Sequence, residues 1–275
     1  MRILFLGDIV GRPGYSAVTD RLPDIREELS LDFVVVNAEN AADGSGLTTR
    51  LFKGLIAAGV DAITMGDHIY RKLELKPLLE EDPRIVKPAN FPAAAPGRPW
   101  TVLPSRSGAE VAVVSLLGRV FMRPVDCPFA AADRVLAEIP ASVKVRIVDV
   151  HAEATSDKQT LARYLDGRVS AVLGTHTHVP TADCQILAGG TAYQTDVGMT
   201  GPYDSVIGRD VDRVMLTTTT FEPIHFHVAT GDVRLCGAVV DVDPRSGQAV
   251  SIVRFETAVN ASPSNRPPSP FPGAV

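Results

Sequence analysis

The chain has 275 residues, of which 45% are hydrophobic and 21% are charged, and its formal net charge is −5. This size and composition are typical of a soluble globular protein with a substantial core, folded as one large α/β domain or two small ones. The acidic balance excludes a general electrostatic attraction to nucleic acid, so we expect no duplex nucleic-acid partner.

The first part of the chain alternates apolar runs with helical patterns. The runs predict three strands, at Arg2–Leu6, Phe33–Val36 and Ala62–Met65. Gly11-Arg12-Pro13-Gly14 is predicted as a loop before a helix over Tyr15–Leu29, which Pro23 is expected to kink or divide. Thr48 or Thr49 is expected to cap the next helix. This β–α–β–α order indicates parallel strands joined by right-handed crossovers.

The middle of the chain is less regular. Leu73–Glu81 predicts a short helix, and the stretch Arg84–Pro104, rich in proline and alanine, predicts extended, loop-like structure. Trp100–Leu103 and Glu110–Leu117 flank a short polar segment and predict a hairpin. Ala131–Ile139 predicts a further short helix.

The second part repeats the strand pattern at Val145–Val150 and Val169–Leu173. Between these runs, Ser156-Asp157-Lys158-Gln159 has the form of a capping box that begins a helix through Leu165. After His178 the pattern changes to antiparallel β, and the expected strands are Asp183–Leu187, Thr191–Thr195, Phe226–Val228, Val233–Val242 and Ala249–Glu256. We expect one domain over residues 1–256 and a mobile, Pro/Ser-rich tail over residues 257–275.

The cysteines and the first residues indicate the compartment. Cys127, Cys184 and Cys236 are far apart and form no C-x-x-C pair, which favours reduced thiols. Gly7-Asp8 interrupts the first apolar run too early for a signal peptide, and no run approaches the length of a membrane span. We therefore expect a cytoplasmic protein with no membrane partner.

Five of the predicted strands stop at a carboxylate, an amide or an imidazole. In an open α/β sheet, ligands bind outside the carboxyl ends of the strands, so we expect these side chains to meet on one rim. The residues at the five ends are Asp8, Glu39 with Asn40, Asp67 with His68, His151, and His176 with His178.

His176 and His178 are two residues apart. In an extended backbone, side chains at that spacing leave on the same side, so both rings can approach one centre. Imidazole is the commonest protein metal ligand, which favours a metal site. A pair of hydrogen-bonded loop histidines is the alternative, and the polar ends of the other strands weigh against it.

The donor set of this rim indicates its chemistry. Carboxylates and imidazoles without a thiolate suit manganese, iron or zinc. Six ligands are too many for one catalytic ion with an open position, so we expect two ions that share a bridging carboxylate. Such a pair clamps a phosphate and lowers the pKa of a bound water, which indicates metal-assisted hydrolysis of a phosphate ester.

These motifs resemble the calcineurin-like metallophosphoesterases, and more closely the YmdB-like branch described as 2′,3′-cyclic-nucleotide 2′-phosphodiesterases. The matching pieces are Gly7-Asp8-Ile9-Val10-Gly11, Asn37-Ala38-Glu39-Asn40, Gly66-Asp67-His68, His151 and Gly174-Thr175-His176-Thr177-His178-Val179-Pro180-Thr181. The resemblance implies a four-layer α/β/β/α sandwich of mixed sheets. It also implies that a metal-bound hydroxide breaks the 2′ bond of a 2′,3′-cyclic nucleotide and leaves a 3′-nucleotide.

The resemblance also assigns roles to individual residues. It implies that Asp8, Glu39 and His178 hold one ion, and that Glu39 bridges to a second ion held also by Asp67, His151 and His176. Asn40 would reach a metal or the substrate phosphate. His68 would protonate the leaving oxygen, with a purely hydrogen-bonding role as the alternative.

Asp67 departs from the family pattern, because most relatives have asparagine there. The extra carboxylate makes the site more anionic, which should strengthen cation binding and favour a harder or higher-valent ion. It should also reduce the Lewis acidity left for water and phosphate.

Other functions and other residues remain open at this point. A broader phosphomonoesterase or short-end nuclease would share the metals, and a regulatory scaffold would bind them without physiologically important turnover. His225 and His227 form a second H-x-H without nearby carboxylates, so we assign them to structure or to a homo-oligomer contact. Phe91 is expected to stack on a base or to pack in the core, and Asp196 to lie in a loop over the pocket.

Overall fold

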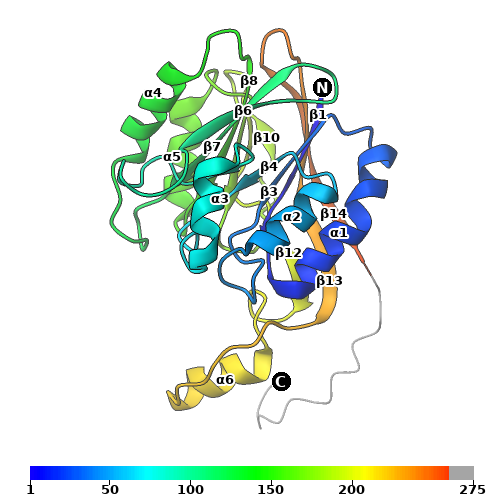
Figure 1. The fold of residues 1–275 in the computed structure, drawn as a ribbon, viewed down its shortest axis with the longest axis vertical. Helices are drawn as coiled ribbons and strands as arrows, with labels where there is room; N and C mark the ends of the chain where they lie inside the picture. Colours follow the sequence, from blue (N-terminus) through cyan, green and yellow to red (C-terminus); the bar gives the residue numbers. More distant parts are fainter. Residues whose placement is uncertain (260–275) are drawn as a thin grey trace.

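The computed structural model describes residues 1–259 of the chain. Within these residues, the strands form an eight-stranded sheet and a six-stranded sheet (Figure 1). Side chains alternate along β1 (Arg2–Leu6), so that Ile3 and Phe5 face the core between the two sheets. Leu4 and Leu6 face the core under the helices, and all four side chains are fully buried.

The first sheet joins strands from both ends of the chain. Its order is β2-β12-β13-β1-β3-β4-β5, and β14 pairs with β13. β1, β3 and β4 are parallel, as the alternating pattern predicted, whereas β13 runs antiparallel to β1. The bounds are Asp8–Ile9 (β2), Phe33–Asn37 (β3), Ala62–Thr64 (β4), Ile85–Val86 (β5), Met199–Asp204 (β12), Gly231–Val242 (β13) and Ala249–Ala258 (β14).

The second sheet has the order β10-β11-β9-β8-β7-β6. β7, β8 and β9 are parallel, and β6 and β7 form the predicted hairpin. β10 and β11 form the second predicted hairpin. The bounds are Trp100–Pro104 (β6), Glu110–Leu117 (β7), Val145–His151 (β8), Ala171–Thr175 (β9), Gln185–Ile186 (β10) and Ala192–Gln194 (β11).

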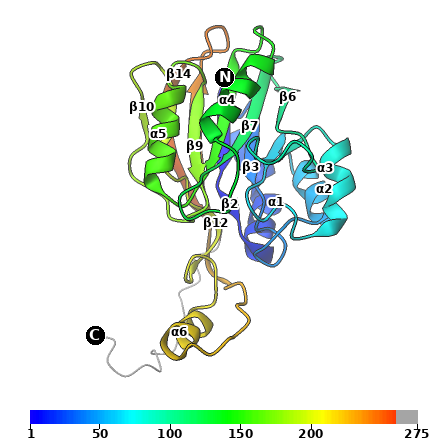
Figure 2. The same ribbon diagram turned by 90° about the vertical axis from the view of Figure 1, so that its left-hand side faces the viewer.

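Helices cover the outer faces of both sheets. α1, α2 and α3 pack on the first sheet and α4 and α5 on the second, with α5 and α2 on opposite sides in Figure 2. The predicted four-layer α/β/β/α sandwich of mixed sheets is confirmed. The bounds are Gly11–Glu28 (α1), Thr49–Ala57 (α2), Leu73–Leu75 (the 3-10 turn η1), Lys76–Glu81 (α3), Pro128–Glu138 (α4), Thr155–Leu165 (α5) and Val211–Thr220 (α6).

Two predictions about α1 depended on its prolines. Residues 11–14 form the first turn of α1 and not a loop, because Pro13 is tolerated where an N–H has no partner within the helix. Pro23 lies inside α1 without dividing it. The stretch predicted as a loop also contains β5, a two-residue edge strand too short to show a pattern.

Two further predictions were wrong because tertiary contacts outweighed the local signal. The capping box is not formed: Ala154 precedes α5, and the Lys158 amine is buried against Asp196. Phe226–Val228 is not a strand, and only Val228 makes an isolated bridge, to Arg209.

α6 was not predicted, because its last four residues are threonines, which are poor helix formers. Asp210 caps it by accepting a hydrogen bond from the Arg213 N–H. None of its residues is buried, and the helix projects from the body of the molecule (Figures 1 and 2).

The end of the described chain differs from the predicted boundary. β14 continues through Thr257 and Ala258, which were assigned to the tail, and residues 260–275 lie outside the described residues. Within residues 1–259, no helix is both long and apolar enough to cross a membrane. Cys127, Cys184 and Cys236 are all free thiols, as predicted.

Candidate metal centre

The predicted rim forms where strands of both sheets end. β1, β3 and β4 point their carboxyl ends in one direction and are followed by Asp8, Glu39 and Asp67. In the second sheet, His151 is the last residue of β8 and pairs with Thr175 at the end of β9. Parallel strands therefore bring carboxylates from one sheet against imidazoles from the other.

Four of these residues form a tight cluster. Glu39, Asp67, His151 and His176 each offer a ligand atom within 4.8 Å of the others. His151 Nε2 lies 3.1 Å from Glu39 Oε1 and 3.3 Å from Asp67 Oδ1. His176 Nδ1 lies 3.0 Å from His151 Nε2 and 3.7 Å from Asp67 Oδ1. These are the four residues that the resemblance assigns to one ion.

Asp8 and His178 lie beside this cluster. His178 Nε2 is 3.8 Å from Asp8 Oδ1 and 3.3 Å from the Asn40 amide nitrogen. Asp8 Oδ2 accepts a hydrogen bond of 2.9 Å from the His176 backbone N–H, which ties the β1 end to the histidine loop. Asp8 and His178 are two of the three residues that the resemblance assigns to the other ion. The third is Glu39, which also belongs to the cluster of four.

Three carboxylate oxygens at this site face imidazole nitrogens but have no hydrogen-bond partner. Asp8 Oδ1, Glu39 Oε1 and Asp67 Oδ1 are buried, and none accepts a hydrogen bond from any residue in the described part of the chain. A buried carboxylate oxygen that is left unpaired costs free energy, and bound cations are a common solution. The residues therefore fit a metal centre.

The electrostatics of the cluster point the same way. Burial lowers the pKa of His151, but Glu39 and Asp67 outweigh this effect and raise it well above its ordinary value. Burial, together with the charge of His151, lowers the pKa of His176 to about 4. The negative charge of these carboxylates therefore favours a cation at this position.

Each histidine has one ring nitrogen turned toward the cluster, because the other is held elsewhere. His151 Nδ1 donates to Thr175 Oγ1 at 2.8 Å, and His178 Nδ1 donates to the Ile207 carbonyl at 2.9 Å. His176 Nε2 lies 3.3 Å from Glu153 Oε2. Such partners fix the tautomer and leave an unprotonated nitrogen free to bind a metal.

The histidine loop is not extended, contrary to the prediction. His176 has φ = +96° and His178 has φ = +67°. Residues other than glycine rarely adopt positive φ values. Thr177 between them is pinned, because its N–H and hydroxyl both donate to Asp196 Oδ2. Asp196 is fully buried and paired with Lys158 at 2.7 Å, so it supports the loop from below and does not cover the pocket.

Gly66 is the residue that lets the two sheets close on the site. A Cβ atom there would lie 2.3 Å from His151 Cδ2 and 2.5 Å from Glu39 Oε2. No real side chain tolerates such contacts. The glycine of the Gly66-Asp67-His68 motif therefore leaves room for two of the candidate ligands.

His68 lies at the mouth of the cluster, with its side chain about a quarter exposed. Its Nδ1 donates to the Asn40 carbonyl oxygen at 2.7 Å, and its backbone N–H donates to Glu39 Oε2 at 3.0 Å. Its Nε2 lies 3.7 Å from Asp67 Oδ2. Asn40 thus orients His68 and leaves Nε2 on the side of the cluster.

Comparison with known proteins agrees with these motifs. The sequence profile of the YmdB-like proteins matches residues 4–255. The chain belongs to the YmdB-like family. The resemblance inferred from the motifs is therefore confirmed.

The relatives of this YmdB-like chain match over nearly their whole lengths. A Bacillus subtilis (strain 168) protein named 2′,3′-cyclic-nucleotide 2′-phosphodiesterase is 47% identical over 93% of this chain and 96% of its own length. A crystal structure of a hypothetical protein from Thermus thermophilus has a TM-score of 0.88 and 44% identity, covering 94% and 99% of the two chains. That of a novel phosphatase from Mycoplasma pneumoniae has a TM-score of 0.87 and 32% identity, covering 94% and 93%.

Behind His151, the YmdB-like chain has a second layer of polar residues that the sequence analysis missed. The Thr175 hydroxyl accepts from His151 and donates to Asp149 Oδ1 at 2.7 Å. Asp149 is fully buried, and Asn37 and Thr64 also donate to it. Burial raises the pKa of Asp149 to about 6. The signal in the sequence was a carboxylate inside the apolar run Val145–Val150.

We expect Thr175→Val to weaken metal binding, because it removes the hydrogen bond that orients the His151 ring. The valine keeps the volume but cannot accept the imidazole N–H, and removing such outer partners typically costs about 10–100-fold in metal affinity or activity. Thr191→Val is the matched control, because Thr191 is also buried and hydrogen-bonded, to Val169 and Gly167, away from the site. Titration of metal-depleted protein with Mn²⁺ measures the difference. Equal affinities in the two variants would contradict the proposed role of Thr175.

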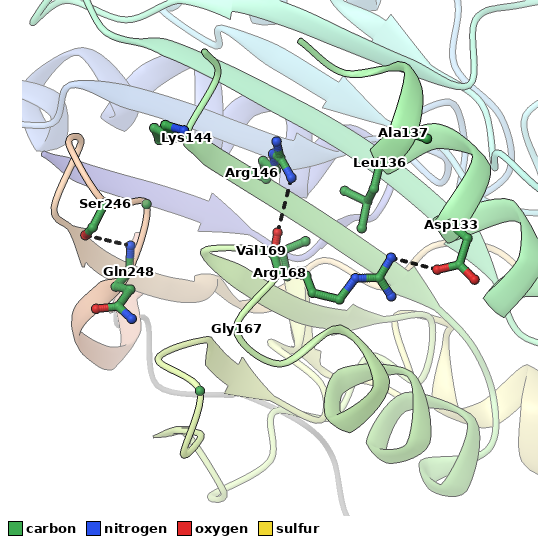
Figure 3. Close-up of a pocket in the computed structure, with 12 residues that line it drawn as sticks. Asp133, Leu136, Ala137, Lys144, Arg146, Gly167, Arg168, Val169, Ser246 and Gln248 are labelled. Carbon is green, nitrogen blue, oxygen red and sulfur yellow. Dashed lines mark hydrogen bonds and ion pairs between the residues drawn. The ribbon is translucent and has the colours of Figure 1, made fainter. Parts of the chain in front are cut away.

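Other residues lie apart from this centre. A pocket of about 450 Å³ includes Lys144, Arg146, Asp133 and Arg168, and Figure 3 shows the Asp133–Arg168 ion pair in its wall. It holds none of the candidate ligands. Phe91 is buried beside Tyr70, as the core-packing alternative predicted.

His225 and His227 stack edge to face with their ring centroids 5.4 Å apart. Both residues are exposed, and neither belongs to the metal-ligating group found in residues 1–259. Their assignment to structure or to an oligomer contact stays a prediction.

Proposed function

We propose that this chain is a metal-dependent phosphodiesterase that hydrolyses 2′,3′-cyclic nucleotides at the 2′ bond and releases 3′-nucleotides. The observation that carries the proposal is that buried carboxylates, with oxygens that accept no hydrogen bond, lie against oriented imidazoles. The name of the Bacillus subtilis relative supports the substrate class. We also place the protein in the cytoplasm.

In this proposal, the site holds two transition-metal ions, with iron or manganese preferred and zinc as an alternative. Asp8, Glu39 and His178 would hold one ion, and Glu39 would be shared with a second ion held by Asp67, His151 and His176. Asn40 reaches an ion or the substrate phosphate. When bound, the ions neutralise the phosphate oxygens and lower the pKa of water, so that a nucleophile is available near neutral pH.

The remaining chemistry belongs to His68. Protonated at Nε2, it donates that proton to the 2′ oxygen as the bond to phosphorus breaks. Asn40 holds its Nδ1–H at 2.7 Å, which turns the Nε2 edge toward the cluster. The Asp67 carboxylate oxygen Oδ2 lies 3.7 Å from Nε2, on the cluster side of the ring.

The first test is elemental analysis of protein purified without chelator, together with the His176→Ala form. We expect about two transition-metal ions per chain in the native protein, and clearly fewer in the variant. His227→Ala is the matched control, because it removes an exposed histidine of the other H-x-H pair. The same samples are assayed with cyclic, linear and terminal phosphates. A folded protein that lacks metal and refuses added manganese, iron and zinc contradicts the proposal, as does a preference for terminal phosphates.

A further inference from the structure

A second pocket, of about 390 Å³, opens directly beside the candidate metal centre. His178 lies in its wall, so one imidazole belongs both to the proposed metal site and to the pocket. The other walls come from the residues after His178, from β12 and from the turn that follows β12. A substrate whose phosphate reaches His178 therefore places its organic part in or next to this pocket.

The lining of the pocket is apolar. Val179 and Ile207 are 57% and 55% exposed, and Met199 and Pro180 line the pocket with them. Large exposed aliphatic side chains beside a polar centre indicate a surface that is covered when a ligand binds. The volume is within the range of sites for small organic ligands.

The hydroxyls of the pocket are already used within the protein. Ser205 Oγ donates to the Pro202 carbonyl and accepts from the Gly208 N–H. The Tyr203 hydroxyl donates to the Met199 carbonyl at 2.9 Å and accepts from the Met199 N–H. The pocket therefore offers contact area, while its side-chain hydroxyls do not offer free donors that would distinguish one ring from another.

Ile207 is held in a conformation that isoleucine avoids. It has φ = +45°, in a turn closed by hydrogen bonds between Val206 and Arg209 in both directions. A β-branched residue in this region is a genuine outlier, and such outliers cluster at functional sites. This turn directs the Ile207 carbonyl to His178 Nδ1 and leaves the side chain exposed at the pocket.

We propose that this pocket, defined by His178, Val179, Pro180, Met199, Tyr203, Ser205, Val206 and Ile207, receives the nucleobase of the substrate. The inference rests on the proposed function, because it places the cyclic phosphate at the metal centre. A flat heterocycle covers the exposed aliphatic surface, and every base has such a face. The enzyme therefore gains affinity from the base without choosing strongly among the four bases.

Steady-state kinetics with two kinds of substrate test this. The native protein should hydrolyse the four nucleoside 2′,3′-cyclic monophosphates with kcat/KM values within about fivefold of one another. Methyl riboside 2′,3′-cyclic phosphate, which has no base, should be at least about tenfold poorer. Ile207→Gly suits the φ of this position and keeps the carbonyl that binds His178. It should lower kcat/KM for the nucleotides about tenfold more than kcat/KM for the base-free substrate, mainly through KM.

Two controls separate the outcomes. Phe221→Gly replaces another exposed apolar residue with positive φ, at the end of α6, and should change neither substrate. Val179→Ala provides a second pocket variant with the same expected pattern. If the native protein cleaves both kinds of substrate equally well and both pocket variants behave like it, the base subsite is wrong while the proposed function stands. If the native protein cleaves no cyclic phosphate, the proposed function itself fails.

Discussion

Glu39→Gln should abolish turnover and remove metal from the protein. Glu39 is fully buried, and its Oε1 lies 3.1 Å from His151 and 3.4 Å from His68 without accepting a hydrogen bond. In the proposed centre this carboxylate would be shared by the two ions, and a neutral amide cannot replace the lost charge. Loss of about 4 kcal/mol of transition-state stabilisation lowers kcat by about 10³-fold.

Metal content, circular dichroism and turnover should be measured on the same preparation of Glu39→Gln. Glu39→Asp is the informative companion, because it retains the charge but shortens the side chain, and we expect it to recover part of the metal content. A Glu39→Gln protein that keeps two ions and loses less than tenfold in rate would show that Glu39 does not bridge.

His68→Ala should separate proton donation from metal binding. The protein should remain folded and keep its metal, because the His68 ring is hydrogen-bonded to Asn40 and is not among the proposed ligands. His68 is also the most exposed of the histidines at the site. Turnover of 2′,3′-cyclic nucleotides should fall by about 10²–10⁴-fold, the usual contribution of a general acid.

The leaving group provides the decisive readout for His68. A p-nitrophenolate leaves without protonation, so hydrolysis of bis(p-nitrophenyl) phosphate should fall less than about tenfold in His68→Ala. Equal losses on both substrates would assign His68 a hydrogen-bonding role, which was the alternative reading of the sequence. Loss of metal in the variant would also argue against the acid role.

The agreement between sequence and structure follows from the kind of signal each residue carries. Buried strands such as Phe33–Asn37 and Val145–His151 were predicted because their apolar runs are local patterns. The first turn of α1 and the projecting α6 were missed, because the first contains proline and the second ends in threonines. Both residue types have low average helix propensity, which does not describe these particular positions. In α5, the buried Lys158–Asp196 pair joins residues too far apart in sequence for any local rule to connect.

The order of residues along the chain was enough to predict the donor set and its place at the ends of the strands. Carboxylates and imidazoles placed directly after apolar runs must gather at the carboxyl ends of parallel strands, whatever the details of packing. The motifs also identified the family, because their order along the chain is specific. None of these conclusions depended on knowing the distances between the side chains.

The tertiary structure alone decided how the site is held. The hydrogen bond from His151 Nδ1 to Thr175 leaves Nε2 of that ring facing the cluster. The hydrogen bond from His178 Nδ1 to the Ile207 carbonyl does the same for His178. Gly66 leaves the space between Glu39, which follows β3 of one sheet, and His151, which ends β8 of the other. These features depend on contacts between strands that are distant in sequence, and a hydrogen bond or a close approach leaves no periodic pattern in the chain.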